Sequence, residues 1–179
     1  MRLPWTNRKP AAEPEMRVLM VCLGNICRSP TAEGALRVRL ARAGLAERVH
    51  VDSAGTAGFH AGDPPDPRAQ RHAQLRGIDL SALRGRRVVA EDFDRHHLVL
   101  AMDEDNLADL QRLRPDGHPN QPQLLLAFAR RYTSIREVPD PYYGGPDGFE
   151  RVLDLIEDAC DGLVLHLQQR LDEGRGGTS

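Results

Sequence analysis

Short apolar runs alternate with longer amphipathic segments along the 179-residue chain, and this order constrains the fold more than any other feature. The first run, "RVLMVCL" at residues 17–23, is short, continuous and rich in branched side chains, which is typical of a buried strand. Runs at residues 48–55 and 96–103 predict a second and a third strand. The run at residues 123–129 is ambiguous by pattern, and its length and position favour a fourth strand.

The amphipathic segments between these runs predict helices. The first helix is expected from Ser29, as a candidate N-cap, to Gly44, with Pro30 in its first turn. The other helices are expected over residues 67–77, 103–114 and 149–171, the last of which has to tolerate Gly162. Strands and helices in this order predict an α/β fold, a four-stranded parallel sheet with helices on both faces in a flavodoxin-like, doubly wound arrangement.

Functional sites of such folds lie at the carboxyl ends of the strands. Cys22, residues 52–55 and Asp103 all fall at the ends of predicted strands. We therefore expect them to gather at one edge of the sheet.

The length suits one domain, which we place at residues 16–171, between a disordered leader at 1–15 and a flexible tail at 172–179. The net charge of −2 gives no electrostatic reason to expect nucleic acid or an anionic membrane as a partner. The sequence contains no run of 18 apolar residues, so no transmembrane helix is expected. The polar leader lacks the apolar core of a secretory signal. We therefore expect a cytoplasmic protein.

The stretch "VCLGNICRSP" contains two of the three cysteines of the chain, Cys22 and Cys27. Their spacing is not that of a C-x-x-C redox pair, and no second pair completes a zinc site. The remaining interpretation is an activated nucleophile, which needs neither a metal nor a cofactor.

The loop from Cys22 to Arg28 lies between a predicted strand and the start of a predicted helix, where backbone N–H groups and the helix N-terminus attract anions. Arg28 adds a planar fork that matches two phosphate oxygens. A thiol at the start of this loop would face the same positive field. We therefore predict a phosphate-binding loop whose intervening residues are Leu23, Gly24, Asn25, Ile26 and Cys27.

Two polar residues of the loop have further predicted roles. Asn25 suits a turn that needs a positive φ, and its side chain can brace the loop. The Ser29 hydroxyl can donate a hydrogen bond to the thiolate while it caps the helix, although capping alone is an equal alternative.

The stretch "CLGNICRSPTAEG" resembles the signature of the low-molecular-weight protein tyrosine phosphatases. "VDSAGT", "DPRA", "AMDEDN" and "DPYYGG" resemble later landmarks of that family, in the same order, so the resemblance covers about residues 16–171. It implies a protein tyrosine phosphatase in which Cys22 forms a phosphocysteine intermediate and Arg28 stabilises the transition state. Asp140 in "DPYYGG" matches the general acid, whereas Asp103 is interpreted as a helix N-cap.

The resemblance also implies roles around the substrate. Tyr142, Tyr143 and Phe59 would form aromatic walls around a phenyl ring. Ser53 resembles a serine that supports the loop. Cys27 would form a reversible disulfide with Cys22, and the alternative is a small side chain that fills the loop. The third cysteine, Cys160, lies on the apolar face of the last helix and is interpreted as core.

Three other functions are compatible with such a loop. An arsenate reductase relay needs downstream cysteines, and none lies between Cys27 and Cys160. Phosphoarginine phosphatases of this kind tend to carry Thr where this loop has Ile26, which suits an aryl ester better. A phosphate-binding module without turnover would not need Cys22, Arg28 and Asp140 together. The expected partners are tyrosine-phosphorylated proteins, among them a bacterial tyrosine kinase.

Overall fold

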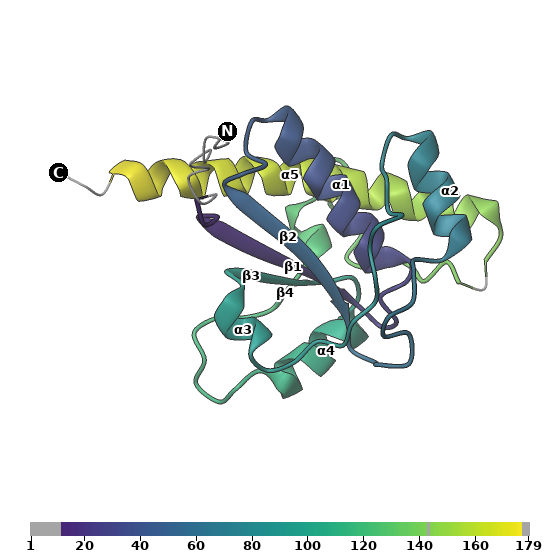
Figure 1. Ribbon diagram of the computed structural model, residues 1–179, viewed down its shortest axis with the longest axis horizontal. Helices are drawn as coiled ribbons and strands as arrows, with labels where there is room; N and C mark the ends of the chain where they lie inside the picture. The colour runs from purple at the N-terminus through teal and green to yellow at the C-terminus, as the bar shows by residue number, and fades with distance from the viewer. Residues whose placement is uncertain (1–11, 143, 177–179) are drawn as a thin grey trace, which may run out of the picture.

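The structure is a computed structural model that describes residues 12–142 and 144–176 (Figure 1). Its sheet is entirely parallel and has the strand order β2-β1-β3-β4, which confirms the predicted fold class. The strands are β1 (Met16–Cys22), β2 (Val49–Gly55), β3 (Leu98–Ala101) and β4 (Gln123–Leu124).

Helices cover both faces of this sheet, as predicted (Figure 1). One face carries α1 (Arg28–Arg42), α2 (Pro67–Leu75) and the long α5 (Pro146–Gly176). The other face carries α3 (Asp92–Arg95) and α4 (Glu104–Leu113). The short helix α3 was not expected from the sequence.

Strand β1 is buried on both sides, which explains why its sequence is continuously apolar. Val18 and Met20 belong to the larger core cluster, together with side chains of α1 and α5. Leu19 and Val21 belong to a second cluster on the side of α3 and α4. Burial of each such side chain contributes about 1.5–3 kcal/mol, so the strand that ends at Cys22 is firmly held.

The run at residues 123–129 is only in part a strand. Strand β4 pairs with β3 at Gln123 and Leu124, and the chain then forms a 3₁₀ helix, η1 (Leu125–Phe128). Leu125 and Leu126 are buried in the larger core cluster, which also contains the apolar face of α5. The apolar side chains of the run are therefore buried by packing against α5 and not by a longer β-ladder.

The start of α1 also differs from the expectation. The helix begins at Arg28, and Cys27 occupies the N-cap position without a side-chain capping bond, so the prediction of Ser29 as N-cap is wrong. The Ser29 hydroxyl lies instead within hydrogen-bond distance of Asn25 and Cys22. Gly44 follows the helix with a φ of 73°, as expected for a residue just past a helix end.

The structure describes only the inner parts of the predicted leader and tail. Residues 1–11 of the predicted leader lie outside the described residues, but the Glu15 backbone N–H donates to the Arg48 carbonyl oxygen at 2.8 Å. Helix α5 continues to Gly176, five residues past the predicted domain end, and residues 177–179 lie outside the description.

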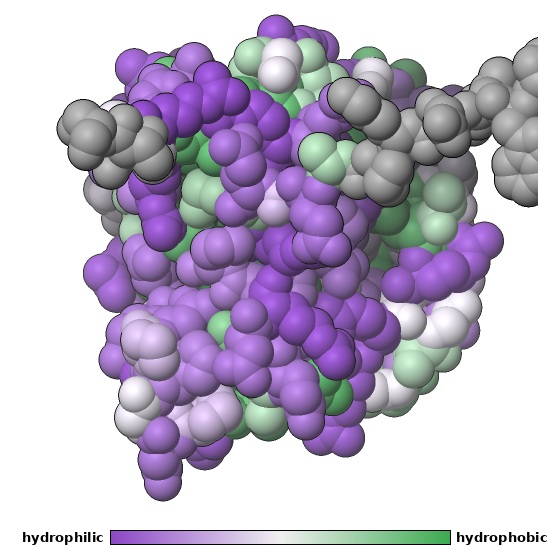
Figure 2. Space-filling view, turned by 60° about the vertical axis from the view of Figure 1, so that its left-hand side comes forward, coloured by the Kyte–Doolittle hydropathy of each residue, from purple (hydrophilic) through white to green (hydrophobic). Residues whose placement is uncertain are grey.

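The face shown in Figure 2 is mostly hydrophilic, with scattered apolar patches. Within residues 12–142 and 144–176, every helix is too short or too polar to cross a membrane.

Gly162 lies in α5 where the carbonyl group of Phe128 approaches the helix. A Cβ atom at position 162 would be 1.8 Å from the Phe128 carbonyl oxygen. We expect Gly162→Ala to lower the free energy of unfolding by about 1–3 kcal/mol, because the contact is with backbone that cannot rotate away.

Gly174→Ala in the same helix is the matched control, since its Cβ would meet no atom within 4 Å. This variant should keep or gain stability, by at most about 1 kcal/mol, because Ala favours helix over Gly. Urea denaturation of both variants checks the prediction, and equal stabilities would contradict it.

Candidate active site

The loop between β1 and α1 is shaped by Asn25. Its φ of 57° is the single positive value at a non-glycine position among the described residues, as predicted for this turn. Neighbouring segments hold the loop by backbone hydrogen bonds: Thr56 N–H donates to the Cys22 carbonyl at 2.9 Å and Ala57 N–H to the Leu23 carbonyl at 3.0 Å. The loop therefore rests on the residues that follow β2.

The Cys22 thiol is the centre of the site and is 3% exposed. Its Sγ accepts the Asn25 backbone N–H at 3.3 Å and lies 3.0 Å from Ser29 Oγ. A thiolate can only accept hydrogen bonds, and the Asn25 backbone N–H and the Ser29 hydroxyl are groups that can donate to it.

The amide of Asn25 donates a hydrogen bond to the Ser29 hydroxyl beside this sulfur. Asn25 Nδ2 donates to Ser29 Oγ at 2.8 Å and to Ser53 Oγ at 3.0 Å. The Ser29 oxygen is thus an acceptor from Asn25, and its own proton remains for Cys22 Sγ or for the Ala54 carbonyl at 3.4 Å. The shorter contact is the one to sulfur, which fits the predicted role of Ser29 toward the thiolate.

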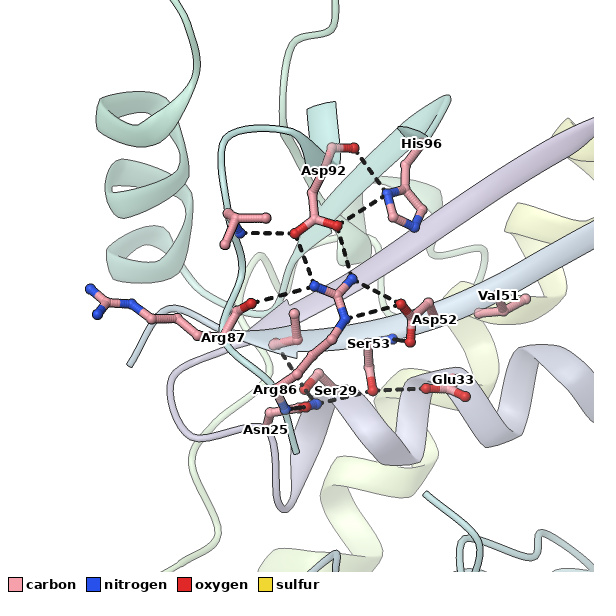
Figure 3. A network of polar contacts seen from close by, with 12 residues as sticks. Asn25, Ser29, Glu33, Val51, Asp52, Ser53, Arg86, Arg87, Asp92 and His96 are labelled. Atoms are coloured by element: carbon pink, nitrogen blue, oxygen red, sulfur yellow. Dashed lines mark hydrogen bonds and ion pairs between the residues drawn. The ribbon is translucent and has the colours of Figure 1, made fainter. Parts of the chain in front are cut away.

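Figure 3 shows how this network continues away from the loop. Asn25 Oδ1 accepts the Arg86 backbone N–H at 3.0 Å, and the Arg86 guanidinium binds both oxygens of Asp92 at 2.9 and 3.0 Å and one oxygen of Asp52 at 2.8 Å. Burial by itself would lower the pKa of Arg86, but the hydrogen bonds to the two carboxylates outweigh it and raise that pKa above its usual value. Arg86 therefore remains a cation that anchors the segment against Asn25.

On the other side, the Ser53 hydroxyl donates to Glu33 Oε1 at 2.8 Å. Glu33 is 2% exposed, and burial raises its pKa, although the nearby Arg37 at 2.7 Å and the Ser53 hydrogen bond favour its charged form. A chain of hydrogen bonds therefore runs from Glu33 through Ser53 and Asn25 to the Arg86 backbone.

Arg28 is held in place mainly by Asp103 and by the Val138 carbonyl. Its Nη1 donates to Asp103 Oδ2 at 2.6 Å and to the Val138 carbonyl at 3.0 Å, and its Nη2 lies 3.8 Å from Asp140 Oδ2. The other oxygen of Asp103 accepts the Asn106 backbone N–H at 2.7 Å, which confirms that Asp103 is the N-cap of α4. The ion pair between Asp103 and Arg28 was not expected from the sequence.

The loop forms the floor of a pocket. Its lining residues are Cys22, Leu23, Gly24, Ile26, Cys27, Arg28, Phe59, His60, Asp140 and Tyr142. All of them except His60 were predicted site residues, whereas Asn25 and Ser29 lie behind the lining and Tyr143 falls outside the described residues. His60 packs edge-on against Phe59 with 4.9 Å between ring centroids, and its position next to Phe59 was the one signal for it in the sequence.

Asp140 lies at the side of this pocket, between Pro139 and Pro141. Its side chain is 47% exposed, and its Oδ1 accepts the Tyr142 backbone N–H at 3.0 Å. Unlike Asp103, Asp140 lines the pocket that holds Cys22.

The other two cysteines are buried thiols. Cys27 is 6% exposed and packs with Ala69 and Phe149, and burial is the main cause that raises its pKa to about 12. This packing agrees with the role of a side chain that fills the loop, and the disulfide with Cys22 stays a prediction. Cys160 lies fully buried in the core, as expected, and burial raises its pKa to about 12 as well.

A buried thiol and an arginine fork on a loop between a strand and a helix are the arrangement found in cysteine-dependent phosphatases. The family model for "Low molecular weight phosphotyrosine protein phosphatase" matches residues 17–173. The chain therefore belongs to this family, and it is a protein-tyrosine-phosphatase.

Two of the following three relatives are tyrosine phosphatases, and the third is an arginine phosphatase. The chain is 42% identical to a low molecular weight protein-tyrosine-phosphatase of Streptomyces coelicolor, over 89% of this chain and 97% of the relative. A protein tyrosine phosphatase of Entamoeba histolytica, solved with Hepes in the active site, is 39% identical and superimposes with a TM-score of 0.82, covering 86% of this chain and 97% of that one. A Drosophila arginine phosphatase is 31% identical with a TM-score of 0.78, covering 85% and 98%.

Replacement of Asn25 separates the backbone conformation from the hydrogen bonds of its side chain. We expect Asn25→Gly to keep the positive φ at little cost and yet to lower kcat about 10–100-fold, because the Ser29 hydroxyl loses its orientation. Asn25→Ala should lose similar activity and in addition about 1 kcal/mol of stability, because alanine is strained at this φ.

Steady-state kinetics and thermal unfolding of the two variants measure the two effects separately. If Asn25→Gly retained the kcat of the unmodified enzyme, the side chain would have no part in arranging the site.

Proposed function

We propose that the enzyme transfers the phosphoryl group of phosphotyrosine first to Cys22 and then to water. In the first step the Cys22 thiolate forms a sulfur–phosphorus bond while the bond from phosphorus to the tyrosyl oxygen breaks. In the second step water attacks phosphorus, the sulfur–phosphorus bond breaks, and inorganic phosphate leaves. The position of Cys22 Sγ at the floor of the pocket, 3.0 Å from Ser29 Oγ, carries this proposal.

Arg28 and the backbone N–H groups of residues 23–28 are proposed to bind the non-reacting phosphate oxygens. The Arg28 side chain is 4% exposed, and its Nη1 is already committed to Asp103 and Val138. An arginine held in this way needs little reorganisation when charge develops on the phosphoryl oxygens, which is the condition for transition-state stabilisation.

Asp140 is proposed to be the general acid and then the general base. As an acid it gives its proton to the tyrosyl oxygen that leaves, and as a base it takes a proton from the attacking water. The half-exposed Asp140 carboxyl at the side of the pocket supports this choice. Both oxygens of the alternative, Asp103, are engaged by Arg28 and by the start of α4.

The mouth of the pocket favours an aryl phosphate. Phe59 is 68% exposed and Tyr142 is 38% exposed, and both line the pocket, so they can enclose a phenyl ring as Ile26 contacts it from the floor. Tyr143 is proposed as a further wall on the basis of the sequence alone.

Tyrosine-phosphorylated proteins are therefore the proposed substrates, and we further propose a bacterial tyrosine kinase among them. A cytoplasmic location fits this role, because a nucleophilic thiol has to remain reduced. The similarity to an arginine phosphatase means that the fold by itself does not distinguish phosphotyrosine from phosphoarginine.

Hydrolysis of matched peptides that carry phosphotyrosine, phosphoserine or phosphoarginine tests the substrate class. We expect kcat/KM for phosphotyrosine to exceed the other two values by at least about 100-fold, because only the aryl ester fills the pocket between its walls. The Cys22→Ser variant supplies the background rate. Faster release of phosphate from the phosphoarginine peptide would reject the proposed substrate class.

Asp140→Asn tests the acid role. The variant cannot donate the proton, so kcat/KM should fall about 10²–10⁴-fold for phenyl phosphate and less for p-nitrophenyl phosphate, whose phenolate leaves unaided. We expect a bell-shaped pH profile of kcat for the unmodified enzyme, and its basic limb should vanish in the variant. An unchanged basic limb would transfer the acid role to another group, and Asp103→Asn is the next variant to measure.

A further inference from the structure

Arg68 lies between the two loops that supply the nucleophile and the acid. It is the second residue of α2, and the Asp66 side chain caps this helix by accepting the Arg68 backbone N–H at 2.8 Å. The Asp66 backbone N–H in turn donates to the Ile26 carbonyl at 2.8 Å. The start of α2 is therefore attached directly to the phosphate-binding loop.

The Arg68 guanidinium is oriented by the same carboxylate. Its Nε and Nη2 donate to the two oxygens of Asp66 at 3.1 and 2.9 Å. This two-point contact fixes the plane of the guanidinium, which a single hydrogen bond would leave free to rotate. The Asp66 side chain is 8% exposed, whereas the Arg68 side chain is 39% exposed.

The guanidinium also contacts the segment that carries the proposed acid, and it contacts Phe149 of α5. Arg68 Nη2 donates to the Tyr142 carbonyl at 3.0 Å. Its central carbon lies 5.5 Å from the centroid of the Tyr142 ring and 5.0 Å from that of Phe149, both within the range of cation–π attraction. Arg68 thus spans from the phosphate-binding loop to the Asp140 segment.

Asp140 depends on this segment for its orientation, because the Tyr142 backbone N–H donates to Asp140 Oδ1 at 3.0 Å. On the N-terminal side, Val138 is held by its N–H to the Met102 carbonyl at 2.8 Å and by its own carbonyl to Arg28 at 3.0 Å. On the C-terminal side, Arg68 holds the Tyr142 carbonyl. The segment is tied at both ends, while the carboxyl between them remains half-exposed.

We infer that Arg68 is a positioning residue that aligns Asp140 with the leaving group by tying the Tyr142 backbone to the phosphate-binding loop. The inference rests on the proposed role of Asp140 as the general acid. A proton donor has to lie within hydrogen-bond distance of the atom it protonates, so a small displacement of the segment affects proton transfer more than phosphate binding.

The test is a double-mutant cycle between Arg68→Met and Asp140→Asn, with two leaving groups. Methionine keeps much of the length of Arg68 and removes its donors. We expect Arg68→Met to lower kcat/KM about 10–100-fold for phenyl phosphate and less than about 5-fold for p-nitrophenyl phosphate. We compare kcat/KM because it reports the step in which the leaving group departs, whereas the later hydrolysis of phosphocysteine is common to both substrates. In the Asp140→Asn background the same change should have almost no further effect on kcat/KM, because the group it aligns is absent.

Arg76→Met is the matched control. Arg76 follows the same helix and bridges to α5 through Glu150, Asp154 and Glu157, and no contact of Arg76 with the Asp140 segment is found among the described residues. Its loss should lower the melting temperature without changing the ratio of the rates for the two leaving groups. Arg68→Lys, which keeps the charge without the fork, should give an intermediate ratio.

The outcomes separate this inference from the proposed function. If Asp140→Asn does not change the dependence on the leaving group, the acid assignment itself fails. If Asp140→Asn changes it but Arg68→Met slows both substrates equally, or acts additively with Asp140→Asn, then Arg68 is merely structural and the inference is overturned. If Arg68→Met does not fold, the ratio of rates in Arg68→Lys decides, and an unchanged ratio overturns the inference.

Discussion

The hydrogen bonds of one amide side chain hold the site together. Asn25 donates to Ser29 and Ser53 and accepts from the Arg86 backbone, so three separate segments converge on it. Its backbone adopts a left-handed conformation that costs about 1 kcal/mol or more for a residue with a side chain. These hydrogen bonds offset that cost, and the turn brings the Asn25 backbone N–H to the Cys22 sulfur.

Charged residues around the loop lie in pairs, and Arg28 and Asp92 among them are buried. Arg86 lies between Asp52 and Asp92, and Arg28 contacts Asp103 directly and Asp140 more distantly. An unpaired charge at such positions would be costly, because burial removes its hydration. The paired arginines therefore stay charged beside the pocket, where a phosphate dianion needs fixed positive groups that do not have to move.

The proposed nucleophile and the proposed acid come from distant parts of the chain and meet next to the central strands. Cys22 ends β1, whose pairing partners β2 and β3 lie on either side of it. Val138, two residues before Asp140, is hydrogen-bonded to Met102 just after β3 and to Arg28 at the start of α1. The carboxyl ends of the central strands thus bring the two groups to one pocket. Arg68 at the start of α2 adds a further connection, its hydrogen bond to the Tyr142 carbonyl.

The sequence alone was enough for features that depend on neighbouring residues. The strand, loop and helix around Cys22 and Arg28, the positive φ of Asn25 and the Asp103 N-cap were all predictable, because turn chemistry and apolar periodicity are local. It was not enough where local patterns are ambiguous. Ser29 is not the predicted helix cap, although it makes the predicted contact with Cys22. The run at residues 123–129 mostly leaves the sheet to pack against α5.

Only the tertiary structure decided which distant side chains meet. The pairs Arg86 with Asp52, Arg28 with Asp103, and Arg68 with the Tyr142 carbonyl join residues 34, 75 and 74 positions apart. In a chain with 24 basic and 26 acidic residues, composition permits very many such pairs. The packing of helices on the sheet selects among them, because an ion pair forms only where the backbone has already placed its two partners within reach. The sequence therefore determined the reactive loop, and the fold decided what surrounds it.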